Sequence, residues 1–372
     1  MKRFFYIEIV PICLLVALLL CSLSMISCEN EGEKLAYIIN SDFETCTVTG
    51  LGEYTSKNLV IPDTINGYKV TRIADYAFRG SDIISFKCSE NIMYIGKGAF
   101  QDCKQLKRAF MPNKLDTIAE YTFACCDNLS YIRFPNNLKV IGKSAFDHCG
   151  SLCSVSIPQG TVTIGERAFY MCTGLTSINI PNGVKIIDNA AFLGCSFAQN
   201  INIPDSVTKI GSQAFGVCLS LEEIFIPASV TEIGASPLGC NYLTKITVDE
   251  NNPELSSING NLYYGNNTIF ANYAGGKPDT SFKIPEGVIE IGATSFSCCD
   301  NLKEIYIPNT VKYIGNAIFY MSANIEKLFY DGTIDEWNSI TKVDDWNAKT
   351  DSVFSIICSD GTIAMDGTVT YK

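Results

Sequence analysis

The cysteines are the residues of this chain whose type and spacing come nearest to a chemical site. The chain has 17 cysteines in 372 residues, and seven of them stand three residues after the phenylalanine of a repeated Phe-x-x-Cys pattern. Zinc sites commonly draw ligands from Cys-x-x-Cys pairs, which are absent here, and disulfides between neighbouring cysteines would need matching Cβ directions. We interpret these cysteines as small buried apolar fillers with a weak S–H donor, rather than as zinc, iron–sulfur or disulfide positions. The column comprises Cys103, Cys126, Cys149, Cys172, Cys195, Cys218 and Cys299.

Catalytic groups are sparse. His148 is the only histidine, and it stands between Phe146 and Cys149, inside the phenylalanine–cysteine pattern. A Ser/His/Asp or Cys/His set would depend on this one side chain. The sequence has no phosphate loop, dinucleotide fingerprint, His-Glu-x-x-His or calcium loop. A pair of carboxylates on turns stays open as an alternative, but nothing singles one out. We expect no enzyme, no cofactor and no metal.

The spacing of these residues comes from an internal repeat of 23 residues. Phe146, Phe169, Phe192 and Phe215 share this interval, and so do isoleucines, prolines and cysteines over the same stretch. A period of this length predicts stacked coils, each unable to bury its apolar side alone. Within a coil, Ile178 and Ile180 would lie on one face of a strand that Pro181 ends. We therefore predict a β-rich, right-handed leucine-rich-repeat-like solenoid with two parallel strands per coil, an Ala-Phe-x-x-Cys corner, and β caps at both ends.

The repeat also sets the expected boundaries. Residues 37–60 alternate apolar and polar side chains and predict an N-terminal β cap. The solenoid is expected over 61–330, with one excursion at 249–283, where Asn259-Gly260 favours a β-hairpin. Residues 331–372 hold both tryptophans, Trp337 and Trp346, and predict a C-terminal cap packed on the last coil.

The first residues predict export. Lys2 and Arg3 precede an apolar run, the order of a secretory signal, so we predict a lipoprotein-type signal peptide over 1–27. Ser27 before Cys28 resembles the bacterial lipobox, which makes Cys28 the predicted lipidation site, although Met25 and Ile26 depart from the usual residues. An uncleaved membrane anchor and an ordinary signal peptide are the alternatives. Residues 28–36 resemble the acidic tethers that carry some lipoproteins to the outer face of the outer membrane.

The negative net charge of the chain argues against partners that are themselves negatively charged. The formal net charge is −11, spread along the sequence without runs. An acidic solenoid repels phosphate backbones, so we expect no nucleic-acid partner. We expect a monomer that meets the membrane only through its N-terminal lipid.

The outward positions of the longer strand are the candidate contacts. Solenoids bind along such extended faces, and exposed aromatic side chains beside arginine are common anchors for partners. The alternative is ordinary cross-strand stacking that stiffens the sheet. The candidate ligand contacts are Phe110, Tyr131, Arg133, Phe225 and Tyr306.

The chain resembles the BspA-like leucine-rich repeat family of bacterial surface proteins. The family signature Ile-x-Ile-Pro-x-x-Val-x-x-Ile-Gly-x-x-Ala-Phe-x-x-Cys-x-x-Leu is matched from Val207 to Leu221, while Asp188 replaces the glycine and Leu238 the phenylalanine elsewhere. The resemblance covers nearly everything after residue 36. It implies surface display and non-catalytic adhesion to host or microbial macromolecules, with an extracellular protein or glycan as ligand. The alternative is a carbohydrate-binding accessory of a surface glycan uptake system.

Overall fold

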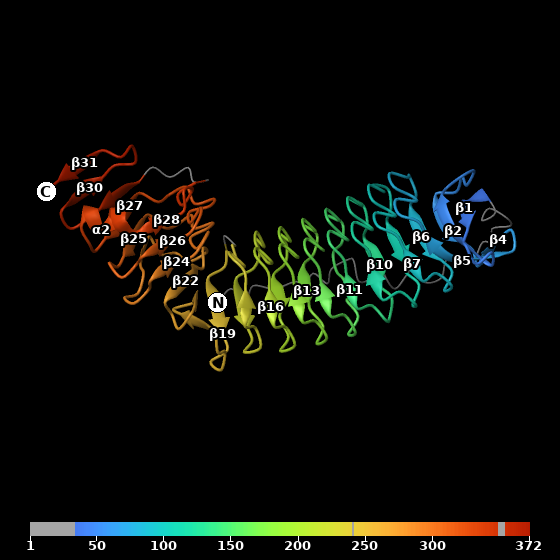
Figure 1. Ribbon diagram of the computed structural model, residues 1–372, viewed down its shortest axis with the longest axis horizontal. Coiled ribbons are helices and arrows are strands. Elements are labelled where there is room, and N and C mark those ends of the chain that lie inside the picture. The colour runs from blue at the N-terminus through green and yellow to red at the C-terminus, as the bar shows by residue number, and fades with distance from the viewer. Residues whose placement is uncertain (1–33, 240–241, 349–353) are drawn as a thin grey trace, which may run out of the picture.

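The computed structural model describes residues 34–239, 242–348 and 354–372. The predicted signal peptide at 1–27 and the predicted lipidation site Cys28 lie outside these residues. The described chain winds into coils that stack along one long axis, from the N-terminal end in blue to the C-terminal end in red (Figure 1). This confirms the predicted β-solenoid. In the part of the chain that the structure describes, no helix has the length and apolar character to cross a membrane.

Each coil contributes one longer strand to a parallel ladder in which residues about 23 apart are partners. Tyr131 pairs with Arg108, and Ile132 with Ala109, so like positions of successive coils lie side by side. Side chains alternate across a strand, which buries Ile132 and exposes Tyr131 and Arg133. The longer strands of the first part are β3 (Asn58–Ile61), β6 (Ser85–Cys88), β8 (Arg108–Phe110), β10 (Tyr131–Arg133), β13 (Ser177–Asn179), β15 (Asn200–Asn202), β17 (Glu223–Ile226) and β19 (Lys245–Val248). These strands form three separate parallel sheets, β3-β6-β8-β10, β13-β15 and β17-β19, because residues 152–157 have no strand pairing and β15 does not pair with β17.

A second, shorter strand in each coil forms a parallel ladder of its own. Its second residue is the periodic isoleucine, as in the pairing of Ile141 with Ile164, and these side chains are buried. The shorter strands of the first part are β9 (Thr117–Ile118), β11 (Val140–Ile141), β12 (Thr163–Ile164), β14 (Ile186–Ile187), β16 (Lys209–Ile210) and β18 (Glu232–Ile233). The prediction of two parallel strands per coil is therefore confirmed.

The Ala-Phe corner supplies a third hydrogen-bonded edge. The backbone N–H of Phe123 donates to the carbonyl of Ala145 at 2.9 Å, and that of Phe146 to Ala168 at 2.8 Å, each in the next coil. In each corner, two residues with left-handed backbone flank the Ala-Phe dipeptide, as Arg167 (φ 56°) and Met171 (φ 55°) do around Ala168 and Phe169. That conformation is disfavoured for residues other than glycine. It recurs because the corner must turn sharply enough to aim alternate N–H groups along the solenoid axis.

The core is a stack of like side chains. The rings of Phe146 and Phe169 lie 5.1 Å apart and those of Phe169 and Phe192 lie 5.2 Å apart, tilted by 6° and 3°. Phenylalanine, isoleucine and leucine side chains fill the interior of each coil and are shielded from water. Burial of each large apolar side chain stabilises the fold by about 1.5–3 kcal/mol.

The chain opens with a small sheet over the first coil. The strand β1 (Ala36–Ile39) pairs antiparallel with β2 (Thr45–Gly50), which lies parallel to β5 (Tyr68–Ile73). The same sheet holds β4 (Thr64–Ile65) and β7 (Tyr94–Ile95). The longer-strand ladder begins with β3 at Asn58, three residues inside the segment predicted as a cap, because β3 already pairs with β6.

The excursion at 249–283 is a joint between two stacks. It contains β20 (Leu255–Ile258), β21 (Asn261–Tyr264) and β22 (Ile269–Asn272) as an antiparallel meander. Asn259 and Gly260 make the first turn, both with positive φ (51° and 75°), as the predicted hairpin requires. The strand β22 then pairs parallel with β24 and starts a new ladder. We call residues 58–248 the N-terminal array and residues 269–357 the C-terminal array; the second is set off from the line of the first in Figure 1.

The C-terminal array repeats the two ladders. Its longer strands are β23 (Ser281–Lys283), β25 (Glu304–Ile307), β27 (Lys327–Tyr330) and β29 (Ser355–Ile357), and its other shorter strands are β24 (Glu290–Ile291), β26 (Tyr313–Ile314) and β28 (Thr341–Lys342). The stacking therefore continues past the predicted boundary at residue 330, because β28 and β29 extend both ladders after the sequence motif has ended.

A helix and two strands close this end. The helix α2 (Ile334–Ser339) carries a capping box between Thr333 and Glu336 and leads into β28. Trp337 packs against Trp346, which contacts Phe319 of the last regular corner at 6.4 Å between ring centres. The strands β30 (Gly361–Ile363) and β31 (Val369–Tyr371) then add antiparallel to β29.

Candidate functional site

The outer face of the longer strands brings three of the predicted contacts together. Phe110 on β8 and Tyr131 on β10 occupy adjacent coils, and their ring centres lie 5.6 Å apart. The guanidinium carbon of Arg133 lies 5.7 Å from the centre of the Phe110 ring, within cation–π range. Tyr131 is 42% exposed. We call Phe110, Tyr131 and Arg133 the aromatic–arginine cluster.

The arginine of this cluster is held in place yet remains half exposed. Its Nη2 donates to the carbonyl of Met111 at 3.3 Å and lies 3.7 Å from the Glu90 carboxylate. An exposed ion pair of this length contributes little to stability, because water and salt screen it. The arrangement therefore presents a positioned guanidinium beside a pair of aromatic rings at the surface, which is the composition of an interface anchor.

The other two predicted contacts stand apart from this cluster and from each other. Phe225 lies on β17 and is 47% exposed. Tyr306 lies on β25 and stacks on Phe329 of β27 at 4.6 Å with an angle of 8°. The two residues belong to different sheets, because β17 pairs only with β19, whereas β25 lies in the sheet that begins at β23. The Tyr306 hydroxyl donates to Glu304, and this hydrogen bond raises the pKa of the tyrosine. Tyr306 thus shows the cross-strand stacking that we considered as the alternative.

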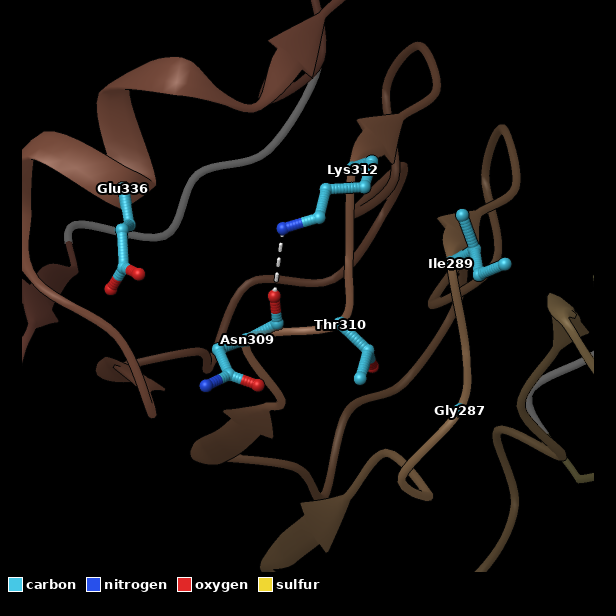
Figure 2. A pocket seen from close by; sticks show the side chains of 6 residues that line it. All are labelled: Gly287, Ile289, Asn309, Thr310, Lys312 and Glu336. Atoms are coloured by element: carbon cyan, nitrogen blue, oxygen red, sulfur yellow. Dashed lines mark hydrogen bonds between the residues drawn. The ribbon is translucent and has the colours of Figure 1, made fainter.

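The structure also holds a hollow of about 590 Å³ beside α2 (Figure 2). Ile289, Thr310 and Lys312 line it from the shorter-strand side, and Glu336 faces it from the helix. The Lys312 ammonium donates to the Asn309 carbonyl at 3.1 Å, and the Glu336 carboxylate accepts from the backbone N–H of Thr333. Both charged groups are therefore engaged within the fold.

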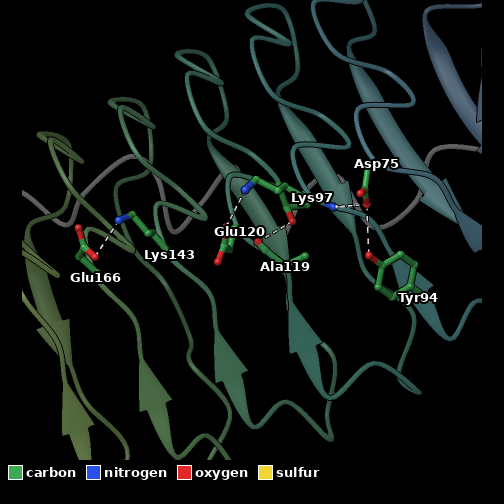
Figure 3. A network of polar contacts seen from close by, with 8 residues as sticks. Asp75, Tyr94, Lys97, Ala119, Glu120, Lys143 and Glu166 are labelled. Atoms are coloured by element: carbon green, nitrogen blue, oxygen red, sulfur yellow. Dashed lines mark hydrogen bonds and ion pairs between the residues drawn. The ribbon is translucent and has the colours of Figure 1, made fainter.

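A second groove, of about 670 Å³, follows the shorter strands of the N-terminal array, and the polar network drawn in Figure 3 lines it. The residue after the glycine position alternates in charge from coil to coil, in the order Asp75, Lys97, Glu120, Lys143, Glu166. Lys97 pairs with Glu120 at 2.9 Å and Lys143 with Glu166 at 2.8 Å, and these hydrogen bonds raise the pKa of both lysines. Asp75 accepts from the Tyr94 hydroxyl at 3.2 Å.

Our sequence analysis missed this charge ladder, although its signal was present. The five side chains follow the periodic Ile-Gly or Ile-Ala pair at the repeat interval, so the alternation of sign can be read once the coils are aligned. Because opposite charges neutralise one another along the groove, the ladder joins neighbouring coils more than it attracts a charged ligand.

The cysteine column lies inside the corner. The thiol of Cys172 donates to the carbonyl of Phe146 at 3.0 Å, and the thiol of Cys149 to that of Phe123 at 3.2 Å, each in the preceding coil. Burial raises the pKa of both thiols well above its usual value. A buried, protonated thiol that bonds to a carbonyl acts as the predicted filler and donor. Among residues 34–239, 242–348 and 354–372, no three His, Cys, Asp or Glu side chains are grouped as a metal ion requires.

His148 lies on the outside of the same corner. Its Nδ1 contacts the Asp147 carboxylate, which also pairs with Arg167 at 3.2 Å. Arg167 in turn covers the Tyr170 ring at 3.9 Å. These contacts join one coil to the next, and they give His148 a structural setting at the surface of the solenoid.

The repeat itself identifies the family. A sequence model described as "BspA type Leucine rich repeat region" matches six copies over residues 49–176, 162–274 and 267–341. The chain belongs to the BspA-type leucine-rich repeat family. These matches span both arrays and the joint between them, so the meander is part of the repeat region.

Solved structures of leucine-rich repeat proteins share the fold. A leucine-rich cell surface protein from Faecalibacterium prausnitzii is 23% identical with a TM-score of 0.57, over 83% of this chain and 96% of that one. A leucine-rich repeat protein from Bacteroides ovatus is 24% identical with a TM-score of 0.54, over 87% of this chain and 98% of that one. No curated protein sequence matches the chain significantly.

Proposed function

We propose that the chain is a surface-displayed, non-catalytic binding module that attaches to extracellular macromolecules through the face of its longer strands. The aromatic–arginine cluster carries this proposal. An exposed tyrosine ring, a half-exposed phenylalanine ring and a half-exposed guanidinium lie together on paired strands, and rigid aromatic and arginine groups supply most of the energy in many interfaces. Family membership supports display at a cell surface, as does the name of the relative from Faecalibacterium prausnitzii.

The route to the surface forms part of the proposal. The predicted signal peptide would export the chain, and lipidation of Cys28 would hold the solenoid at the outer membrane as a monomer. In intact cells, a membrane-impermeant label should then reach the protein. Replacement of Cys28 with alanine should release the protein from the membrane fraction. Retention of the Cys28→Ala protein in that fraction would overturn the lipid anchor without touching the binding proposal.

The binding face is tested by removing two of the three anchors. Phe110→Ala with Arg133→Ala should weaken adhesion of the purified protein to its target surface at least tenfold, since anchor truncations commonly cost more than 2 kcal/mol. A matched control removes one exposed aromatic and one exposed arginine elsewhere, Phe197→Ala with Arg79→Ala. Circular dichroism confirms folding of both variants. Unchanged adhesion in the first variant would remove this face from consideration.

A further inference from the structure

A strip of uncharged polar side chains lies on the longer-strand face beyond the aromatic–arginine cluster. The first of three coils presents two serines, the second a serine and an asparagine, and the third two asparagines, at positions that alternate with buried or half-buried apolar residues. All six side chains are exposed or half exposed, and within the described residues none has a hydrogen-bond partner for its hydroxyl or amide. We call these residues the neutral strip: Ser154, Ser156, Ser177, Asn179, Asn200 and Asn202.

The strip carries no charged side chain, unlike the outward positions on either side of it. The outward positions before it include Lys87, Arg108 and Arg133, and those after it include Glu223 and Lys245. The whole chain carries a formal charge of −11, so a charge-free stretch over several coils departs from the rest of the molecule. A charged partner would find no opposite charge here. A neutral partner would meet groups that both donate and accept hydrogen bonds, which serine hydroxyls and asparagine amides do.

Aromatic side chains flank the strip at both ends. Tyr131 stands in the coil before it and Phe225 in the coil after it, and both are more than 40% exposed. The coils from Tyr131 to Glu223 are four steps apart, which corresponds to about 19 Å at the usual strand spacing. Flat apolar rings at the ends and hydrogen-bonding groups between them match a chain of sugar rings, whose faces are apolar and whose edges carry hydroxyls.

The spacing of the coils adds an independent argument. Ring centres of successive corner phenylalanines in the same coils lie 5.1–5.7 Å apart, so equivalent surface groups recur at a similar interval. A polymer of sugar rings has a unit of comparable length and can place one ring over each coil. A globular protein without internal repeats has no such translational repeat on its surface.

We propose that the neutral strip binds an uncharged polysaccharide, extended along the solenoid axis between Tyr131 and Phe225. This inference rests on the proposed function, because it assigns a partner class to the same face. The occupant is a neutral glycan because the strip offers free hydroxyls and amides, no charge, and a repeat at the length of a sugar ring.

The test is affinity electrophoresis and calorimetry with a soluble neutral β-glucan, a galactomannan and an α-glucan, with polygalacturonate as the anionic comparison. At least one neutral polymer should bind, with affinity unchanged between low and high salt because no ion pair contributes. Asn179→Ala with Asn202→Ala should weaken that binding at least tenfold. Asn136→Ala with Asn182→Ala, which removes two exposed amides from turns of nearby coils, should leave it unchanged.

The possible failures are distinguishable. Absence of binding to all neutral polymers, or binding that survives the loss of Asn179 and Asn202, overturns the glycan assignment alone. In that case adhesion to a protein surface that still depends on Phe110 and Arg133 leaves the proposed function standing. Binding of polygalacturonate that weakens with salt would likewise overturn the neutral partner. Adhesion that is insensitive to all of these residues overturns both proposals.

Discussion

The two arrays use the same backbone ladders but fill the corner with different chemistry. In the N-terminal array a thiol donates to the phenylalanine carbonyl of the preceding coil, as Cys172 does to Phe146. In the C-terminal array Ser322 occupies this position and donates to Phe296 at 2.6 Å, while it accepts from the N–H of Cys299 at 2.8 Å. The corner therefore requires a small donor that reaches back one coil, and either a thiol or a hydroxyl meets this requirement.

The aromatic stacks differ in the same way. Rings near Phe169 are parallel within a few degrees, whereas Phe296 is tilted by 37° from Phe270 and by 36° from Phe319. Phe270 comes from the joint and Phe319 packs on Trp346 of the closing segment, so the rings of the C-terminal array have unlike neighbours. Parallel stacking thus depends on strict repetition on both sides. The hydrogen-bonded ladders do not, since they continue into the closing segment.

High pH should separate the arrays most strongly. The pKa values of the buried thiols Cys126, Cys149, Cys172 and Cys195 are raised above the ordinary value of about 9, chiefly by burial. The folded chain keeps these protons when the unfolded chain loses them, so stability is complete below pH 9 and falls above it. Each of the four thiols lowers the free energy of unfolding by about 1.4 kcal/mol per pH unit above pH 9, which gives about 5.6 kcal/mol in total by pH 10.

The C-terminal array should respond less to the same change. Burial raises the pKa of Cys299 in this array and that of Cys358 directly after it, against four such thiols in the N-terminal array, and Ser322 does not titrate in this range. Burial lowers the pKa of Lys342 to about 8, so the unfolded chain binds more protons than the folded chain between pH 8 and 10.5, and this lysine adds stability as the pH rises. Urea unfolding at pH 8 and 10 is followed by far-ultraviolet circular dichroism and by fluorescence of Trp337 and Trp346, which report the C-terminal array alone. Serine at the four thiol positions should flatten the dichroism response; a persistent response would exclude the thiols.

Removing one core ring should break one array and leave the other. Phe169→Ala deletes a fully buried ring between Phe146 and Phe192 and should cost about 3–5 kcal/mol. Because coils touch only their neighbours, the dichroism transition should move to lower urea while tryptophan fluorescence keeps its midpoint. Phe296→Ala, in the C-terminal array, should instead move the tryptophan fluorescence transition to lower urea. Equal shifts of both signals in either variant would mean that the arrays unfold as one unit.

The donor at the corner should matter more where it serves two partners. Ser322→Ala leaves the carbonyl of Phe296 and the N–H of Cys299 without a partner and should cost about 2–3 kcal/mol. Cys172→Ala removes one weak S–H donor and should cost about 1 kcal/mol. The urea midpoints of the two variants give the comparison. A larger loss for Cys172→Ala would contradict the two-partner role, and Ser322→Cys should recover part of the loss.

The corner backbone should respond alike in both arrays. Ala190 and Ala317 have φ values of 53° and 44°, where an L-residue is strained and glycine is not. Ala190→Gly and Ala317→Gly should each stabilise the protein by about 0.5 kcal/mol, once the greater entropy of unfolded glycine is included. The adjacent Ala191→Gly, which loses a buried methyl, should instead destabilise by about 1 kcal/mol. Destabilisation at Ala190 comparable to that at Ala191 would show that the corner is unstrained.

The regular part of the fold could be predicted because its neighbours are its own copies. A 23-residue interval between Ile141 and Ile164 is enough to place them side by side, and the buried Cys149 follows from the same alignment. The joint could not be predicted in this way. Asn259-Gly260 indicated a hairpin, but pairing of β22 with β24 depends on contacts that no repeat specifies. The continuation through β28 and β29 was missed for the same reason, since these strands pair with the ladders without carrying the motif.

The candidate site also has a part that the repeat predicts and a part that it does not. Adjacent coils bring Phe110, Tyr131 and Arg133 together, as the spacing predicts. The excursion at 249–283 already predicts the separation of Phe225 from Tyr306. The separation of Phe225 from the cluster could not be predicted, because it depends on β17 lying in a different sheet from β8 and β10. The Ser154–Ser156 segment also lacks strand pairing although it keeps the repeat. Periodicity therefore predicts which residues are neighbours, and the interruptions determine which surfaces are continuous.

The corner hydrogen bonds have a consequence for how such chains change length. At the corner, each coil donates backbone N–H groups to the next coil and offers the equivalent carbonyl groups to the preceding one. The bonds from Phe123 to Ala145 and from Phe146 to Ala168 show this pattern. Gain or loss of one whole coil leaves each donor opposite an acceptor, whereas a single added residue displaces all three edges at once. Unequal recombination within the gene can therefore lengthen or shorten the molecule in whole units, and natural variants should differ by complete coils far more often than by fragments of one.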